Sequence, residues 1–423
     1  MSGIELLAEG SAPKTANSGV VWPSRPKAET GDVISDLSPM LTEIGPVADA
    51  AVDLIRFATA AYIADERIER PPSFNRTLEV AVQVTDLDRW GDGALDVLAD
   101  LLEATTGDRW ELEAVAADPL AEPEATRDEP RRVDRIALLS GGLDSFAGAA
   151  LTSETGNIAY LGHWDIPTVK GAQNKVRDHF RDLGRPLDYV QLQHGLRTGK
   201  REHSQRTRAV LFKSLAVALA TARGARVVEV PENGFTSLNP PLGPERGGPL
   251  TTRSTHPMTI SAVNGLLAAI GLDIRVENPH QWRTKGELVD LASGHLPQFA
   301  EGVAKTYSCA KMDGGRYRGG DWNKHCGLCY ACMVRRGAIA ASGVADATDY
   351  LCNSLAPDQQ LRLIERRRVD IDAVKMALEV GVSDLDVLAL GPFPADFDLD
   401  DDLARAVDLC RRGFDEIRRV ALP

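Results

Sequence analysis

The sequence predicts an α/β protein built on a parallel sheet with helices on both faces. Strand-like and helix-like segments alternate between residues 133 and 340, and this alternation is typical of a parallel sheet. A glycine-rich turn directly follows the first of these strands. Four of the six cysteines gather between Cys309 and Cys332, which predicts a metal-binding knuckle. A small α+β domain is expected before this unit and a helical region after it.

The composition is that of an ordinary globular protein. Of the 423 residues, 43% are hydrophobic and 26% are charged, which excludes a disordered, collagen-like or small disulfide-rich chain. The length suggests two to four domains. The net charge of −13 disfavours sequence-independent DNA binding, although it leaves room for a local basic patch. Polar residues interrupt the longest uncharged stretch, residues 256–272, so we expect no membrane span. The N-terminus has an early Glu5 and no apolar run, so we expect no secretory signal. A cytoplasmic location is therefore expected.

Residues 1–118 are predicted to form the small α+β domain, although residues 1–30 carry little signal. Apolar spacing or alternation predicts a helix over Pro46–Glu66, a strand over Thr77–Val84, a helix over Ala94–Ala104 and a strand over Trp110–Val115. Residues 119–132 are rich in proline and charge and have no apolar period, which predicts a linker. A charged docking segment is the alternative interpretation.

The second unit, residues 133–340, supplies the predicted parallel sheet. Its strands are expected at Arg135–Leu139, Ile158–Leu161, Tyr189–Leu192, Val227–Val230 and Leu272–Val276. Helices are expected between them, at Lys170–Leu183, Thr207–Arg223 and Pro257–Ile270. Residues 341–423 are mostly helical in pattern, and an acidic run over 396–402 is expected to be a solvated face or a capping stretch.

The segment Ser140-Gly141-Gly142-Leu143-Asp144-Ser145 is suited to binding phosphate. The two glycines let the backbone turn tightly and approach a ligand, and the helix that follows offers free N–H groups. Two serines add hydroxyl donors, and Asp144 is expected to orient the loop or to help hold Mg²⁺. The segment is not a Walker loop, which requires a different spacing. The alternative is a purely structural glycine turn.

The four cysteines Cys309, Cys326, Cys329 and Cys332 have a spacing suited to one tetrahedral metal site. A tight knuckle would supply three thiolates, and Cys309 would close the site from upstream. We expect structural zinc, although an iron–sulfur cluster uses the same ligands. His325 is interpreted as a bystander, and Cys352 and Cys410 as buried apolar residues.

These motifs together resemble a known enzyme family. The loop is similar to the SGGxDS loop of PP-loop ATP pyrophosphatases, and with the downstream cysteines it resembles 7-cyano-7-deazaguanine synthase, the QueC family. Thr284-Lys285-Gly286-Glu287 is similar to the TKxE stretch of that family. Arg208 matches the Arg of its Arg-Asn pair, but Ala209 replaces the Asn. The resemblance covers residues 133–340. The extra N-terminal region, a longer cysteine insertion and the 253–257 segment look most like the QueC-like protein of Qat anti-phage systems.

The resemblance implies an ATP-dependent adenylating enzyme. The carboxylate of 7-carboxy-7-deazaguanine, or a close analogue, would attack ATP to give an acyl-adenylate and pyrophosphate. An amine, either ammonia or an amine of a protein partner from a defence operon, would then displace AMP. The implied sites are ATP and Mg²⁺ at Ser140–Ser145 with His163 and Trp164, catalysis by Asp144, Lys285 and Arg208, and the substrate at Glu232, Asn233, Arg253 and His256.

Several of these residues have plainer interpretations. Lys285 could be a solvated lysine, Trp164 a packing residue and His256 a helix cap rather than a general base. Two other functions also stay open. One is a tRNA-thiolating enzyme, which would use the basic side chains between Lys170 and Arg208. The other is a nucleotide-binding scaffold of a defence complex that has lost turnover.

Overall fold

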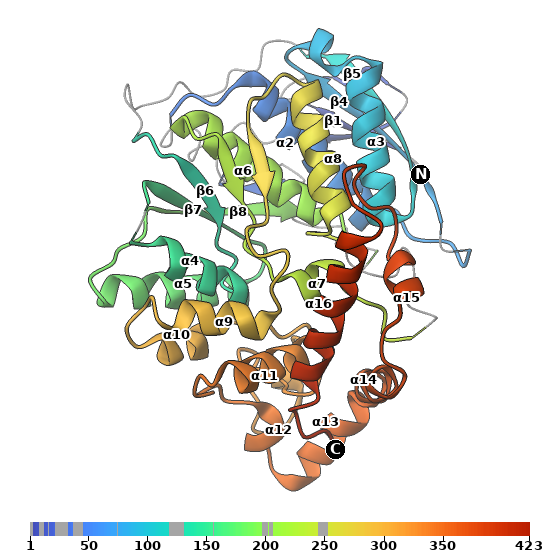
Figure 1. The fold of residues 1–423 in the computed structure, drawn as a ribbon. Helices are drawn as coiled ribbons and strands as arrows, with labels where there is room; N and C mark the ends of the chain where they lie inside the picture. Colours follow the sequence, from blue (N-terminus) through green and yellow to red (C-terminus); the bar gives the residue numbers. More distant parts are fainter. Residues whose placement is uncertain are drawn as a thin grey trace.

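The computed structural model in Figure 1 describes most of the chain. The described residues are 3–7, 12–15, 17–21, 33–36, 45–73, 75–117, 131–154, 156–196, 202, 206–243 and 253–423. All but the last two residues of the predicted linker, 119–132, fall outside these ranges. The division of the chain into four parts therefore stays a prediction.

The N-terminal region contains a four-stranded sheet in which all neighbouring strands are parallel, in the order β2-β1-β4-β5. Its elements are β1 (Gly3–Leu7), β2 (Ser18–Val21), α2 (Asp49–Arg67), β4 (Thr77–Val84), η1 (Leu87–Trp90), α3 (Asp92–Thr106) and β5 (Arg109–Ala116). The two helices and two strands that the sequence predicts between residues 46 and 115 are confirmed. The strands β1 and β2 are additional, because residues 1–30 gave no usable pattern.

The central sheet has six strands in the order β10-β9-β6-β7-β8-β3. The first five are parallel, and β3 joins the edge antiparallel to β8. The strands are β3 (Val33–Ser35), β6 (Arg135–Leu138), β7 (Ile158–Trp164), β8 (Tyr189–Leu196), β9 (Val227–Glu229) and β10 (Arg275–Glu277). The predicted parallel sheet is thus confirmed, with its edge completed by a strand from the N-terminal region.

Helices cover both faces of this sheet, as Figure 1 shows. One face packs on α4 (Leu143–Thr152), α5 (Pro167–Asp182), α9 (Lys285–Ser293) and α10 (Phe299–Lys305). The other face packs on α6 (Arg208–Arg223) and α8 (Pro257–Ala269). Strand β7 shows why both faces are apolar: Ile158 and Tyr160 enter one core, whereas Ala159 and Leu161 enter the other. The second core also contains α2 and α3, so the N-terminal region and the central sheet share a core.

The remaining elements are helical, and those after the cysteine-rich segment form the helical region that the sequence predicts. They are α7 (Gly234–Leu238), which precedes that segment, and then η4 (Gly314–Arg316), α11 (Tyr330–Ser342), α12 (Leu351–Ser354), α13 (Pro357–Arg366), α14 (Arg368–Val380), α15 (Asp384–Leu388) and α16 (Asp401–Ile417). The acidic run has the expected capping role, because Asp398 accepts hydrogen bonds from the N–H groups of Asp400 and Asp401 ahead of α16. Among the described helices, none combines the length and apolar character needed to cross a bilayer.

Candidate functional site

The glycine-rich loop runs from the carboxyl end of β6 into the N-terminus of α4. Gly141 has a φ of +82°, and a Cβ there would lie 2.9 Å from the backbone nitrogen of Gln173, so this position requires glycine. No side chain caps α4, which leaves its first N–H groups available to an anion. The hydroxyls of Ser140 and Ser145 lie 3.1 Å apart beside these groups. The loop therefore has the donors and the shape that phosphate binding requires.

Asp144, in the first turn of α4, forms a buried ion pair with Lys285. The Lys285 Nζ lies 2.5 Å from Asp144 Oδ2, and the Asn233 amide donates to the same oxygen at 2.9 Å. Glu232 Oε1 lies 3.9 Å from Lys285 Nζ. Asp144 Oδ1 is buried and has no hydrogen-bond partner among the described residues. Two carboxyl groups, one ammonium and one amide thus meet beside the glycine-rich loop.

The two carboxyl groups have opposite pKa shifts. Burial alone would raise the pKa of Asp144, but the nearby Lys285 ammonium and the hydrogen bonds to this carboxylate hold it below its ordinary value. Burial raises the pKa of Glu232 well above its ordinary value, and the adjacent Asp144 carboxylate adds to this shift. Asp144 is therefore ionised at neutral pH, and Glu232 is the carboxyl group of the pair that binds a proton more readily.

The C-terminal helix α16 helps to hold Lys285 in place. Lys285 is the first residue of α9, and Thr284 and Glu287 form a capping box at this helix start. Glu416 on α16 accepts hydrogen bonds from the Thr284 hydroxyl and, at 3.0–3.1 Å, from the Gly286 N–H. A Cβ at Gly286 would lie 2.5 Å from the Glu416 carboxylate, so a side chain there would push this carboxylate out of its position.

A cavity of about 400 Å³, called here the site pocket, opens over these groups. The predicted residues Ser140, Gly142, Leu143, Asp144, Ser145, Glu232 and Lys285 line it. The other lining residues are Pro231, Thr236, Asn239, Ser254, Thr255, Tyr307, Ser308, Tyr330, Ala331 and Val334. The volume lies in the range of small-molecule pockets.

The four cysteines come together as the spacing predicts. Their sulfur atoms all lie within 4.8 Å of one another, and all four side chains are buried. The Cys326 N–H points at the Cys309 sulfur, 3.5 Å away, and the Cys329 N–H points at the Cys326 sulfur, 3.2 Å away. His325 is a bystander, because its Nε2 accepts the Ser308 N–H at 3.0 Å.

A metal ion fits the chemistry of this cysteine cluster. Hydrogen bonds from neighbouring thiols lower the pKa of Cys326, whereas contacts with the same sulfurs raise the pKa values of Cys329 and Cys332 well above the ordinary range. Four thiols this close cannot all ionise without a cation. A closed, buried, four-sulfur site is what structural zinc prefers.

The cysteine cluster also builds part of the site pocket. Tyr307 and Ser308 directly precede Cys309, and Tyr330 and Ala331 lie between Cys329 and Cys332; all four line the pocket. The Tyr307 N–H donates to the Gly141 carbonyl at 2.9 Å, which ties the segment before the cluster to the glycine-rich loop. The sequence analysis did not identify these residues, although their position next to the metal ligands was a usable signal.

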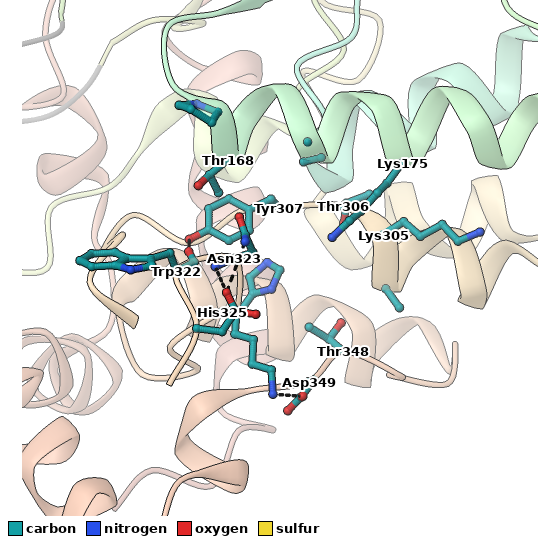
Figure 2. Close-up of a pocket in the computed structure, with 16 residues that line it drawn as sticks. Thr168, Lys175, Lys305, Thr306, Tyr307, Trp322, Asn323, His325, Thr348 and Asp349 are labelled. Carbon is teal, nitrogen blue, oxygen red and sulfur yellow. Dashed lines mark hydrogen bonds and ion pairs between the residues drawn. The ribbon is translucent and has the colours of Figure 1, made fainter. Parts of the chain in front are cut away.

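Tyr307 also lines a second cavity of about 650 Å³ between α5 and the residues that precede the cysteine knuckle. Figure 2 shows Thr168 and Lys175 on α5 above this space, Tyr307 and His325 within it, and Trp322 at one side. Lys324 also lines this cavity, and its ammonium is paired with Asp349 at 2.5 Å. Tyr307 therefore lies between the two cavities and lines both.

Three other predicted residues gather away from the site pocket, at the carboxyl end of β7. His163 is buried, with its Nε2 at the His194 carbonyl and its ring 4.5 Å from that of Phe212. The Lys170 ammonium lies 4.1 Å over the Trp164 ring. Arg208 pairs with Asp165 at 3.3 Å. None of His163, Trp164 and Arg208 lines the site pocket.

The two predicted residues of the 253–257 segment also face elsewhere. Arg253 packs its guanidinium against Gly391, and its Nη1 lies 3.4 Å from the Ala104 carbonyl. His256 is fully buried and caps α8 through Nδ1, which accepts the Met258 N–H at 3.3 Å. The capping interpretation of His256 is thus the one that the geometry supports.

The chain is similar to proteins of queuosine biosynthesis. The family model of queuosine biosynthesis protein QueC matches residues 254–343, which include Lys285 and the whole cysteine cluster. The 7-cyano-7-deazaguanine synthase of Ruegeria sp. (strain TM1040) is 25% identical over 236 residues, which are 51% of this chain and 92% of the relative. That of Paracoccus denitrificans is 26% identical over 237 residues, 51% of this chain and 92% of the relative. That of Porphyromonas gingivalis is 27% identical over 243 residues, 52% of this chain and 98% of the relative.

These relatives correspond to about half of the chain, as expected if the parts outside the parallel sheet are additions to a common domain. The parallel sheet, the cysteine cluster and the matched sequences agree, and together they support a QueC-like family for the half of the chain that the relatives cover.

Proposed function

We propose that this protein uses ATP to activate the carboxylate of 7-carboxy-7-deazaguanine, or a close analogue, and joins it to an amine. The observation that carries this proposal is the Asp144–Lys285 pair, which lies with Glu232 at the mouth of the glycine-rich loop. A polyphosphate leaving group requires charge neutralisation, and a carboxylate is unreactive toward an amine until it is adenylated. The same pocket offers donors for phosphate and groups that can hold a proton.

The first step would join the carboxylate and the α-phosphate of ATP. A substrate carboxylate oxygen attacks the α-phosphorus, the bond from that phosphorus to the bridging oxygen breaks, and pyrophosphate leaves with the electron pair. The N–H groups at the start of α4 and the ammonium of Lys285 would stabilise the charge that develops on the phosphates. Arg208 is 3.3 Å from Asp165 and would have to exchange this partner to take part.

Magnesium fits the site. Asp144 Oδ1 is a buried, unpartnered carboxylate oxygen, and Mg²⁺ prefers such ligands together with phosphate oxygens. Asp144, with Glu232 beside it, would hold the ion, and the ion would supply charge neutralisation on the polyphosphate. Zinc would occupy the cysteine cluster, where its role would be to keep Tyr307 and Tyr330 in the pocket wall.

The second step would form the carbon–nitrogen bond. The amine nitrogen attacks the acyl carbon, the bond from carbon to the AMP oxygen breaks, and the amine loses a proton. When ionised, Glu232 is suited to accept that proton, because its raised pKa makes its carboxylate a stronger base than that of an ordinary glutamate. Asn233 would act by orienting Asp144, to which it donates at 2.9 Å.

For the amine we propose ammonia or an amine of a protein partner, with a role in anti-phage defence. The support is the resemblance of the full layout to the QueC-like protein of Qat systems and the additional N-terminal sheet. A cytoplasmic location goes with this proposal. If the purified protein, supplied with ATP, the carboxylate and its operon neighbours, never yields a covalent adduct by mass spectrometry, the protein-acceptor version is wrong.

Three of the arginines that favoured a tRNA-thiolating enzyme pair with carboxylates in α5 or just after α4. Arg177 and Arg181 both pair with Asp178, at 3.0 and 2.9 Å, and Arg185 pairs with Glu154. A phosphate backbone would have to compete with these carboxylates, so the geometry favours the small-molecule carboxylate.

The deciding experiment measures AMP and pyrophosphate released from Mg·ATP with and without 7-carboxy-7-deazaguanine. We expect carboxylate-dependent AMP from the wild type, none from Asp144→Ala, and wild-type rates from Lys324→Met, whose lysine pairs with Asp349 away from the loop. ATP binding without AMP in the presence of the carboxylate would contradict the proposal and support the scaffold alternative. AMP formation that does not depend on the carboxylate would point to a different substrate.

A further inference from the structure

One wall of the site pocket is held by a buried lysine for which the described part of the chain offers no acidic partner. Lys213 on α6 is 2% exposed, and its Nζ donates to the Ser254 carbonyl at 2.5 Å and to the Ala209 carbonyl at 3.4 Å. Among the described residues, no carboxylate is paired with it. Lysines are almost never this buried unless they are paired, because desolvating an ammonium is costly. Burial lowers the pKa of Lys213 to about 7.

The carbonyl that Lys213 binds belongs to the pocket wall. Ser254 and Thr255 line the site pocket and form, with Arg253 and His256, the 253–256 segment that leads into α8. Lys213 itself does not line the pocket, so it acts on the pocket only through this segment.

A second polar connection ties the same segment to the reacting groups. The Ser237 hydroxyl donates to the Thr255 hydroxyl at 3.0 Å, and the Asn278 amide donates to Ser237 at 3.1 Å. The side-chain oxygen of Asn278, Oδ1, accepts a hydrogen bond from the backbone N–H of Glu232 at 3.4 Å. The 253–256 segment is thus fixed on one side by the α6 lysine and on the other by a chain that ends at Glu232.

Packing alone does not explain a lysine at this place. A methionine side chain has nearly the same length, would fill the space between α6 and the 253–256 segment, and would carry no desolvation cost. What the amine adds is two donated hydrogen bonds, the shorter of which holds the backbone of the wall.

We propose that Lys213 is a positioning residue that fixes the 253–256 segment and thereby sets the affinity of the site pocket for its carboxylate substrate. The part of this inference that concerns affinity rests on the proposed function. The part that concerns the segment does not, and a measurement without substrate tests it.

Hydrogen–deuterium exchange of the full chain tests the anchoring. In Lys213→Met we expect the amides of residues 254–256 and 258 to exchange about tenfold faster or more, with exchange in the central strands unchanged. The control is Ser214→Ala, which removes the next α6 side chain, a buried hydroxyl that donates only to the Val210 carbonyl. If Lys213→Met does not fold, Lys213→Gln, which keeps a donor on a shorter side chain, replaces it. Wild-type exchange over residues 254–256 and 258, or a uniform rise over the whole chain, overturns the anchoring.

Steady-state kinetics test the effect on the substrate. In Lys213→Met we expect the KM for the carboxylate to rise about tenfold, with the KM for ATP and kcat within about threefold of wild type. Ser214→Ala is expected to match wild type in all three. Equal increases in both KM values, or a loss confined to kcat, would contradict a role in positioning the carboxylate side of the pocket. A wild type that releases no AMP with the carboxylate refutes the proposed function and the affinity claim together, while the exchange result still decides the anchoring.

Discussion

Replacing Lys285 by methionine should destabilise the protein in a way that depends on pH. The Lys285 and Asp144 side chains are only 10% and 5% exposed, so solvent cannot replace the lost ammonium efficiently. Without the ammonium, the buried carboxyl pair of Asp144 and Glu232 retains one negative charge with no cation beside it. Its pKa should then rise above the ordinary value, the opposite of the shift that Asp144 has in the intact site.

The size of the effect follows from proton linkage. In the wild type, the lowered pKa of Asp144 contributes stability that is present above pH of about 4 and is lost as pH falls through the lowered value. In Lys285→Met the contribution of the carboxyl pair to stability changes sign. Folding is penalised by about 1.4 kcal/mol for each pH unit above about 4, up to about 4 kcal/mol at pH 7. Breaking a buried ion pair by removing one partner costs about 3–5 kcal/mol, and the penalty expected at pH 7 lies within this range.

Urea unfolding at pH 4, 5.5 and 7 measures this effect, with Lys324→Met as the control. Lys324 and Asp349 form a pair that is 33% and 54% exposed, so its loss should cost less than about 1 kcal/mol at every pH. The difference between wild type and Lys285→Met should be small at pH 4 and largest at pH 7. A difference that is the same at all three pH values would refute the reasoning, because lost packing rather than an uncompensated charge would then be the cause.

Three further predictions concern other parts of the molecule. Gly141→Ala should cost about 1–3 kcal/mol in urea unfolding, because its φ of +82° and a backbone nitrogen 2.9 Å from the added Cβ both oppose a side chain; a stability equal to wild type would contradict this. Burial lowers the pKa of His256 to about 4. Between pH of about 6.5 and 4 the unfolded chain therefore binds a proton that the folded chain does not, so the stability of the fold decreases as the pH is lowered through this range. His256→Asn should reduce that acid loss by up to about 3 kcal/mol in the same assay, and an unchanged acid loss would count against it. Elemental analysis should find one zinc per chain in the wild type and in Cys410→Ala but none in Cys329→Ala, and iron in place of zinc would identify a cluster instead.

The sequence predicted those elements best whose signal is local and repeated. The helix α2 and the strand β4 have a long apolar period, and both lie within a few residues of their predicted bounds. The glycine-rich loop and the cysteine cluster were equally clear, because each depends on a fixed spacing of special residues. In these cases the chemistry is contained in one short segment.

The strand β1 was missed because its one charged residue has distant partners. The sequence analysis used Glu5 only as an argument against a secretory signal, yet its side chain is fully buried. Its carboxylate accepts hydrogen bonds from the Lys14 N–H, the Thr15 N–H and hydroxyl, and the Gln83 amide. A buried carboxylate is tolerated only with such a set of donors, and no local pattern announces donors that lie up to 78 residues away.

The substrate residues were the weakest part of the sequence analysis for the same reason. Arg253 and His256 were chosen for their chemistry, but Arg253 packs on Gly391 and His256 caps α8. Their neighbours Ser254 and Thr255 line the pocket instead. Side-chain direction in an irregular segment depends on what packs behind it, which here is Lys213 on a helix some 40 residues earlier in the chain.

The geometry of Lys285 depends on the end of the chain as well. Glu416 on α16 binds the Thr284 hydroxyl and the Gly286 N–H, on either side of Lys285, and burial raises the pKa of this glutamate while those two bonds oppose the rise. A carboxylate at the N-terminus of α9 also stabilises the start of that helix through its dipole. The C-terminal region is therefore connected to the reacting groups through the residues on either side of Lys285. A change at Glu416 should act on the Asp144–Lys285 pair even though Glu416 makes no contact with the site pocket.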